Sequence, residues 1–305
     1  MDGTHAIGVD LGGTKILAGV VARDGSVVRR HERPTPLDTQ EHLVAEMEAA
    51  IAELLDDGVG AIGFGVPSST DQRTGVVFGT VNTPFRGMPL RDHMERRFER
   101  PVGVDNDANA AMIGEWRAGA ARGVDDALML TLGTGLGGGA ISGGRPFRGA
   151  NGIGTEFGHV VIVHDGIPCQ GICTGRGHLE PYVTGVAAGK RAQEAFGPAA
   201  DAHRLVRLAN EGDPTAKEIL TDIARHLGSG MGSFVNVFGP ELLVLGGGFG
   251  VAAYEHLVEP ATEVMLRETL PPMRERVRVV KAELGTAAGL IGAAFVGFEA
   301  LDAAG

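Results

Sequence analysis

Two glycine-rich turns, each placed between short apolar segments, constrain the fold of this chain more than any other feature. The first turn, residues 10–15, reads DLGGTK and follows the apolar run at residues 6–9. The second turn, residues 133–139, reads GTGLGGG and follows Ala127–Leu132, about 120 residues later. Each pattern is typical of a strand, a tight turn and a second strand. The repetition predicts an internal duplication, in which two related α/β domains begin in the same way.

Apolar periodicity and turn residues locate the remaining elements. Thr39 is placed to cap a helix whose apolar side chains recur at helical spacing, and residues 61–66 form an apolar run that ends at Pro67. Further strands are predicted at residues 16–21, 27–32, 102–104, 140–142, 242–245 and 277–280. Further helices are predicted at residues 90–98, 108–117, 185–195, 202–211, 214–238, 254–268 and 287–301.

These elements divide into an N-terminal α/β domain, residues 1–117, and a larger C-terminal α/β domain, residues 118–289. The last helix, about residues 290–305, is expected to pack back on the first domain. No low-complexity linker separates the halves, which favours a hinge over a tether. The N-terminus lacks a basic, apolar signal pattern, so neither a targeting peptide nor a fused DNA-binding domain is expected there.

Charge and cysteine content argue against several classes of protein. The net charge of −11 disfavours a general affinity for nucleic acid or anionic membranes. No uninterrupted apolar run reaches membrane-spanning length. Two cysteines cannot form a disulfide framework, which favours a cytoplasmic location. The 49 glycines indicate a backbone that turns tightly or approaches a ligand closely.

The chemistry of the two glycine turns suits phosphate binding. The first turn lacks Walker A spacing, but its glycines let backbone N–H groups approach oxygens, and Thr14 and Lys15 add a hydroxyl and a charge. Asp10 is suited to a hydrated Mg²⁺. Thr134 lies in the matching place of the second turn. The alternative is that each motif is only a hairpin turn with polar residues on the surface. If the two glycine turns face each other, however, they would hold a polyphosphate between them. A third cluster, GGG at residues 246–248, follows a strand and suits a nucleotide base or ribose, although many strand-to-helix turns use glycine.

A polar cluster follows the predicted strand at residues 102–104. Asn106 and Asp107 are consistent with a turn or a helix cap, but Asp107 could instead accept a proton from a substrate hydroxyl. Glu156 and His159 precede a short loop that holds both cysteines, and Glu180 follows it. Carboxylates that orient several hydroxyls are what a sugar pocket needs.

Together, the motifs resemble a known family. GVDLGGTK, NDANAAMIGE, LTLGTGLGGG, ANGIGTEFGH and LGGG occur in this order over nearly the whole chain. They resemble the ROK family of sugar kinases and repressors, in its bacterial glucokinase branch. The resemblance implies a two-domain actin-like ATPase fold, ribonuclease H-like, with the active site in the interdomain cleft. It also implies ATP-dependent phosphorylation of a hexose, with glucose expected, at the 6-hydroxyl.

The resemblance also implies roles for individual residues, with Asp107 as the catalytic base. The sugar would be held by Asn82, Asn106, Asp107, Glu156, His159 and Glu180. The phosphates and their Mg²⁺ would be surrounded by Asp10, Gly12, Gly13, Thr14, Lys15, Thr134 and Gly135, and the adenosine would lie near Gly247 and Gly248. Family repressors carry an N-terminal DNA-binding domain, which is not expected here.

Members of the family commonly bind a structural zinc through the histidine of an ExGH motif and three cysteines in a C-x-C-G-x-x-G-C pattern. This chain departs from the pattern, because Cys169 and Cys173 are spaced C-x-x-x-C and His178 stands in place of the last cysteine. His159, Cys169, Cys173 and His178 still offer four ligands for a tetrahedral zinc. A disulfide or two free thiols are the alternatives.

Several alternatives stay open at the level of the sequence. The sugar could be mannose, fructose or an N-acetylated hexosamine, and the phosphate donor could be polyphosphate. A sugar sensor without catalytic activity is the alternative from another class of protein. The family resemblance also implies a homodimer or homotetramer.

Overall fold

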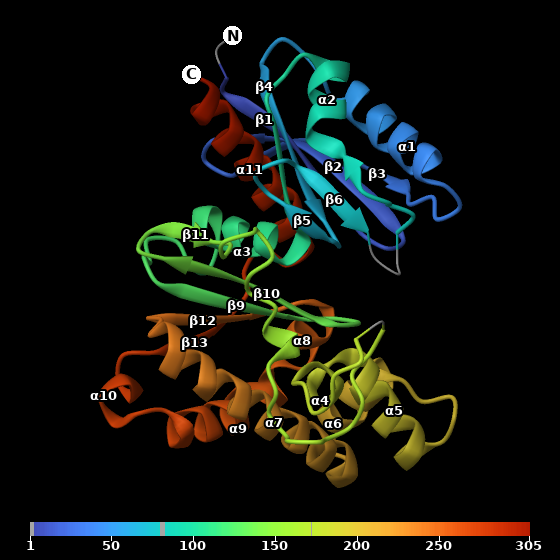
Figure 1. Ribbon diagram of the computed structural model, residues 1–305. Coiled ribbons are helices and arrows are strands. Elements are labelled where there is room, and N and C mark those ends of the chain that lie inside the picture. Colours follow the sequence, from blue (N-terminus) through green and yellow to red (C-terminus); the bar gives the residue numbers. More distant parts are fainter. Residues whose placement is uncertain (1–2, 80–82, 172) are drawn as a thin grey trace.

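Two five-stranded sheets with the same topology form the framework of the molecule (Figure 1). The structure, a computed structural model, describes residues 3–79, 83–171 and 173–305. The strand orders are β3-β2-β1-β4-β8 and β11-β10-β9-β12-β13. In both sheets the first three strands are antiparallel, and the next two run parallel to the third. This shared order is what an internal duplication predicts.

The strands of the first sheet are β1 (His5–Leu11), β2 (Lys15–Ala22), β3 (Val27–Pro34), β4 (Val59–Val66) and β8 (Val102–Asn106). Those of the second are β9 (Ala127–Leu132), β10 (Leu136–Ser142), β11 (Arg145–Phe147), β12 (Leu242–Gly246) and β13 (Arg278–Lys281). A small third sheet contains β5 (Ser69–Asp71), β6 (Val76–Gly79) and β7 (Met88–Pro89). All the predicted strands are present, most of them longer by a few residues, and β5, β6, β7 and β11 lie in stretches for which the sequence predicts no strand.

Helices cover the sheets. They are α1 (Gln40–Ala52), α2 (Leu90–Phe98), α3 (Asp107–Ala118), α4 (Glu180–Val183), α5 (Gly185–Phe196), α6 (Ala202–Asn210), α7 (Pro214–Phe238), α8 (Gly248–Ala252), α9 (Tyr254–Glu268), α10 (Pro271–Arg274) and α11 (Ala288–Ala304). Two 3₁₀ turns span Phe157–His159 and Gly285–Ala287. Thr39 caps α1 as predicted, because its side-chain oxygen accepts the N–H of His42. The predicted bounds of α2, α7 and α9 are confirmed.

A row of glycines lets α11 lie directly on the first sheet. The row crosses four neighbouring strands in register and consists of Gly19, Gly8, Gly63 and Gly103. A Cβ atom on Gly63 would lie 1.8 Å from the carbonyl oxygen of Ala293 in α11. At Gly8 and Gly103 the corresponding distances to carbonyl oxygens of α11 are 2.1 Å and 2.2 Å. Since real atoms cannot approach so closely, only glycine permits this contact between helix and sheet.

Helix α3 lies between α11 and the second sheet (Figure 1). Gly292 of α11 faces the backbone of α3, where an added Cβ would lie 1.6 Å from the carbonyl oxygen of Ala110. On the other side, Gly139 of β10 leaves room for Met112, whose Cβ would lie 2.5 Å from an added Cβ. The predicted second turn at residues 133–139 is therefore wrong in its extent, because its last three glycines belong to β10 and make room for packed side chains.

Helix α11 packs back on the first sheet, and its residues from Ala288 to Phe298 are all buried. Within the described residues, one helical segment, Gly285–Ala304, is long and apolar enough to cross a membrane by length and composition alone. A buried core helix passes the same test, so this is weak support for a membrane span. The domain boundaries at residues 117–118 and 289–290 stay predictions.

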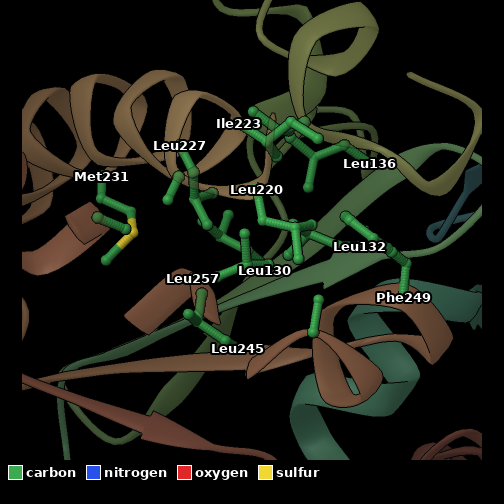
Figure 2. Close-up of a cluster of buried hydrophobic side chains, with 14 of the residues drawn as sticks. Leu130, Leu132, Leu136, Leu220, Ile223, Leu227, Met231, Leu245, Phe249 and Leu257 are labelled. Carbon is green, nitrogen blue, oxygen red and sulfur yellow. The ribbon is translucent and has the colours of Figure 1, made fainter. Parts of the chain in front are cut away.

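A separate apolar core joins the second sheet to its helices. Figure 2 shows leucines of β9 and β12 meeting apolar side chains of α7 and α9. The labelled residues are Leu130, Leu132, Leu136, Leu220, Ile223, Leu227, Met231, Leu245, Phe249 and Leu257. Four of the labelled side chains belong to α7, and they recur at intervals of three and four residues, which is the spacing of one helical face. This core holds β9 and β12 in place beneath the loops that follow them.

The glycine row generates a stability prediction. Gly63→Ala should lower the free energy of unfolding by about 1–3 kcal/mol or more, because a carbonyl oxygen of a packed helix cannot rotate away from the added methyl group. Urea denaturation of the two proteins measures the change. Gly189→Ala is the matched control: Gly189 lies within α5, its added Cβ would meet nothing closer than 3.6 Å, and alanine favours helix. Equal unfolding midpoints for Gly63→Ala and the wild type would contradict the packing argument.

Candidate active site

A cleft of about 970 Å³ lies where the glycine turns of the two sheets meet. The predicted site residues in its wall are Gly13, Thr14, Asn106, Asp107, Thr134, Gly135, Glu156, His159, Glu180 and Gly247. A second hollow of about 400 Å³ shares Asp107 and Gly247 with the cleft and adds Asp10 and Gly248. Residues that lie far apart in the sequence are thus brought to one place.

The two glycine turns join the corresponding strands of the two sheets, and each is closed by a backbone hydrogen bond from its first glycine, although the first turn has one more residue between the last paired residues of its strands. Gly12, Gly13 and Thr14 connect β1 to β2, and the N–H of Gly12 donates to the carbonyl oxygen of Lys15 over 2.9 Å. In the second sheet, residues 133–135 connect β9 to β10, and the N–H of Gly133 donates to the oxygen of Gly135 over 2.9 Å. The two turns present a threonine each to one cleft, which is the arrangement that the duplicated pattern predicts for phosphate binding.

Three of the predicted positions stand apart. Asn82 lies outside the described residues. Gly12 is not in the cleft wall, and Lys15 points elsewhere, because its Nζ pairs with the carboxylate of Glu32 at 2.9 Å. Both partners are about half exposed, so this pair holds the lysine weakly. The roles of these three residues stay predictions.

The cleft also contains polar residues that the sequence analysis missed. They are Asp38, Ser68, Ser69, Thr83, Arg86 and Thr131. Ser68 and Ser69 come two and three residues after the end of β4, and predicted site residues lie at or next to the ends of its neighbours β1 and β8. Because parallel strands bring their carboxyl ends to one edge of the sheet, this position was a signal that could have identified the two serines.

Asp107 is placed by the junction between β8 and α3. Asn106 caps the helix, because its side-chain oxygen accepts the N–H groups of Ala108 (2.9 Å) and Asn109 (3.3 Å). The prediction that Asn106 caps a helix is therefore confirmed. The cap fixes the next residue, Asp107, at the first position of α3, where it lies in the wall of the cleft. Burial raises the pKa of Asp107 to about 6, the N–H of Ala108 lowers it, and the charge of Glu156 raises it.

Further carboxylates gather around Asp107. Burial raises the pKa of Asp10 to about 7, and the charge of Asp107 adds to the rise while Lys15 opposes it. Burial also raises the pKa of Glu156, with His159 lowering it and Glu180 raising it. Glu180 is fixed to the second glycine turn region, since its Oε2 accepts the N–H of Leu136 over 2.9 Å. The cleft therefore concentrates negative charge, which a divalent cation would relieve.

Two histidines and two cysteines form a compact cluster at the edge of the cleft. Single ligand atoms of His159, Cys169, Cys173 and His178 all lie within 4.8 Å of one another. The two Nδ1 atoms are 3.3 Å apart, Cys169 Sγ is 3.6 Å from Nδ1 of His159, and Cys173 Sγ is 3.5 Å from Nδ1 of His178. Burial raises the pKa of Cys169 to about 11, the N–H of Gln170 lowers it, and the neighbouring thiol of Cys173 raises it.

Three of the six distances between the ligand atoms of the cluster match those of a tetrahedral metal site. Bond lengths of about 2.3 Å to sulfur and about 2.0–2.1 Å to nitrogen place the ligand atoms of tetrahedral zinc about 3.3–3.4 Å apart for nitrogen pairs and about 3.5 Å apart for nitrogen–sulfur pairs. The three distances in this cluster agree with those values. Because Nδ1 of His159 faces the cysteines, its other ring nitrogen remains for the cleft, which this residue also lines.

Known proteins resemble the chain over nearly its whole length. A family model described as the ROK family matches residues 6–298. A glucokinase from Streptomyces coelicolor is 34% identical over 94% of this chain and 96% of its own length. An N-acetyl-D-glucosamine kinase from Pectobacterium atrosepticum is 33% identical over 95% of this chain and 97% of its own length.

A solved structure shares the fold. The crystal structure of a ROK family glucokinase from Streptomyces griseus, in complex with glucose and AMPPNP, has a TM-score of 0.82 and 35% identity, and covers 97% of this chain and 99% of that one. This likeness confirms the predicted α/β fold class, the actin-like ATPase arrangement of sugar kinases. With the family match over residues 6–298, the chain belongs to the ROK family.

Proposed function

We propose that the protein is an ATP-dependent hexose kinase that converts glucose to glucose 6-phosphate. The observation that carries this proposal is the position of Asp107, which shares one cleft wall with both glycine turns and with Glu156, His159 and Glu180. A base, two phosphate-binding turns and a set of hydroxyl-binding side chains are the parts that phosphoryl transfer to a sugar requires. Similar proteins that bear the name glucokinase, one of them solved with glucose and AMPPNP, support the same reading.

Asp107 has the properties of a general base. A pKa of about 6 leaves its carboxylate ionised at neutral pH while keeping it a better proton acceptor than an ordinary aspartate. In the proposed reaction Asp107 accepts the proton of the 6-hydroxyl as that oxygen bonds to the γ-phosphorus, and the bond to the bridging oxygen of ADP breaks. Retention of this carboxylate in the cleft argues against a sugar sensor without activity.

The remaining residues bind and orient the substrates. Glu156, His159 and Glu180 would accept or donate hydrogen bonds to the sugar hydroxyls, together with the part of Asn106 that is not used for capping. The backbone N–H groups and threonines of the two turns would hold the phosphates, and Gly247 and Gly248 would face the adenosine. Asp10, at the end of β1, fits a hydrated Mg²⁺, which supplies charge neutralisation at the phosphates when it is bound.

The cysteine–histidine cluster fits a structural zinc. Such an ion would hold the Nδ1 atom of His159 and so fix the orientation of the ring toward the sugar. It would also tie the loop of Cys169 and Cys173 to His178, two residues before Glu180. The cytoplasmic location and the homodimeric or homotetrameric state stay predictions.

A substrate panel tests the function directly. With ATP, glucose should give the highest kcat/KM among glucose, mannose, fructose and N-acetylglucosamine, measured by coupled ADP release. N-acetylglucosamine is the main competitor, since a kinase named for this sugar is almost as similar to the chain. Polyphosphate in place of ATP tests the donor.

Asp107→Asn should lower kcat by about a hundredfold or more while the Kd for glucose changes little. Turnover near the wild-type rate in this variant would remove Asp107 as the base.

The raised pKa of Asp107 predicts a pH dependence. Protonation removes the base, so kcat/KM for glucose should fall about tenfold per pH unit below about pH 6. Glu156→Gln should move this midpoint to lower pH, because the charge of Glu156 raises the pKa of Asp107. Activity profiles between pH 4.5 and 8 for both proteins, with stability checked at each pH, measure the shift. A wild-type midpoint near pH 4, or an upward shift in the variant, would contradict this assignment.

The proposed zinc site predicts metal content. The purified protein should contain about one zinc per chain by elemental analysis, and Cys173→Ser should lose most of it because three ligands remain. The glucose KM of this variant should rise while the ATP KM stays nearly constant, since only the sugar side of the cleft is loosened. His164→Gln, an almost fully exposed histidine of the same loop, is the control. Fully active protein without zinc would refute the proposed role.

A further inference from the structure

Arg148 joins three parts of the chain that meet beside the cleft. Its Nε donates to Oδ2 of Asp105 in β8 over 2.7 Å, and its Nη2 donates to Oε2 of Glu299 in α11 over 2.8 Å. Arg148 itself follows β11 of the second sheet. One guanidinium therefore links the second sheet to a strand and a helix of the first. The planar fork of arginine suits this double contact, which lysine could not reproduce.

Burial makes this contact more than a surface ion pair. The side chain of Asp105 is 0% exposed, that of Arg148 is 19% exposed and that of Glu299 is 33% exposed. Burial alone lowers the pKa of Arg148, but the charges of Asp105 and Glu299 outweigh it and raise the pKa above its ordinary value. Because a buried carboxylate without a partner is strongly unfavourable, Asp105 constrains where Arg148 can lie.

A second set of contacts extends from the same aspartate to the sugar side of the cleft. Oδ1 of Asp105 accepts the side-chain amide of Asn109 over 3.2 Å, and Oδ1 of Asn109 accepts the hydroxyl of Thr155 over 3.0 Å. Asn109 lies in the first turn of α3, two residues after Asp107. Thr155 immediately precedes Glu156 and has a φ of +67°, a left-handed conformation that is strained for a β-branched residue.

Asp105 thus holds the segment from Arg148 to Glu156 directly at its beginning and, through Asn109, near its end at Thr155. Neither Arg148 nor Asp105 lines the cleft, and the proposed chemistry does not use them. Without these bonds, the strained conformation at Thr155 is held only by local bonds within residues 148–157, such as the bond from its hydroxyl to the carbonyl oxygen of Gly154. These local bonds do not tie the segment to β8 or α11, so we expect the carboxylate of Glu156 to leave its place near Asp107.

We propose that Arg148 is a positioning residue for sugar binding, which fixes the 148–156 segment against β8 and α11 and so holds Glu156 in the cleft. The proposal rests on the proposed function for its link to sugar, but the fixation of the segment does not depend on it.

Arg148→Gln tests this proposal. The Kd for glucose by calorimetry and the glucose KM should both rise about 10- to 100-fold, because displaced binding groups lose their alignment. The ATP KM should stay within about twofold, since the glycine turns are not touched. Hydrogen–deuterium exchange of residues 149–158 should become faster. The matched control is Arg145→Gln, an exposed arginine on β11, which should behave as the wild type in every measurement.

A double variant separates positioning from general stability. Arg148→Gln leaves Asp105 buried without its partner, so it should also lower the melting temperature. Asp105→Asn combined with Arg148→Gln removes that charge and should restore stability without restoring glucose affinity. Recovery of both stability and glucose affinity in the double variant would overturn the proposal, and so would unchanged glucose affinity in Arg148→Gln.

Glu299→Ala is the alternative if Arg148→Gln does not fold, because it removes only the more exposed partner of Arg148. It should raise the glucose Kd by a smaller factor. An unchanged glucose Kd in this variant would count against the proposal.

Failure of the proposed function has a different signature. If the wild type neither binds nor phosphorylates any hexose, the kinase assignment fails. Hydrogen–deuterium exchange then remains the test of whether Arg148 fixes the 148–156 segment, because this measurement needs no substrate. Equal exchange of residues 149–158 in Arg148→Gln and Arg145→Gln would overturn the positioning role.

Discussion

Direct contact between the backbone of α11 and a row of glycines in the first sheet is the constraint on which the rest of the structure depends. A side chain at Gly63 would meet the carbonyl oxygen of Ala293 at 1.8 Å, so any other residue would push the helix outward. Helix α3 packs against α11 with similar closeness at Gly292. Since α3 begins with Asp107, the glycine row sets how far the proposed base stands from the first glycine turn. The abundance of glycine in this chain thus reflects close packing of helices as well as tight turns.

Electrostatics in the cleft follow from this placement. Asp10, Asp107 and Glu156 come from three segments, and burial is the main cause that raises the pKa of each. A neighbouring carboxylate adds to the rise in every case: Asp107 acts on Asp10, Glu156 acts on Asp107, and Glu180 acts on Glu156. An excess of carboxylates would repel a bare triphosphate. A nucleotide that arrives with a divalent cation brings the missing positive charge, since the charge of Lys15 only partly offsets these carboxylates while its Nζ pairs with Glu32. In the free protein, burial and the neighbouring charge together keep part of Asp10 protonated near neutral pH, and burial is the main reason why Asp107 is a stronger base than an ordinary aspartate.

Much of this arrangement could be predicted from the sequence. Local signals were sufficient where one element determines the result: the cap at Thr39, the bounds of α7 and the strand–turn–strand units all follow from neighbouring residues. Residues that follow strand ends could be assigned to one cleft, because parallel strands end at one edge. Contacts between distant segments could not be predicted in this way. Nothing near Lys15 in the sequence indicates that Glu32 pairs with it, and nothing near Arg148 indicates Asp105 and Glu299. Glycines within β10 were mistaken for a turn, because composition alone cannot distinguish a turn from a strand that a helix approaches closely.

The segment from Arg148 to His159 shows how two different anchors serve one pocket. At its beginning, Arg148 forms ion pairs with parts of the first sheet and α11. At its end, His159 belongs to a cluster with the spacing of a metal site. Glu156 lies between them, next to the strained Thr155. Either anchor alone would leave one side of this segment free to relax, and a carboxylate must be held to within about 0.5 Å to distinguish one hydroxyl arrangement from another. The altered spacing of the two cysteines is compatible with the proposed metal site, because Nδ1 of His178 lies 3.3 Å from Nδ1 of His159 and supplies a fourth ligand atom. In the proposed function, such a site would act by fixing the ring of His159.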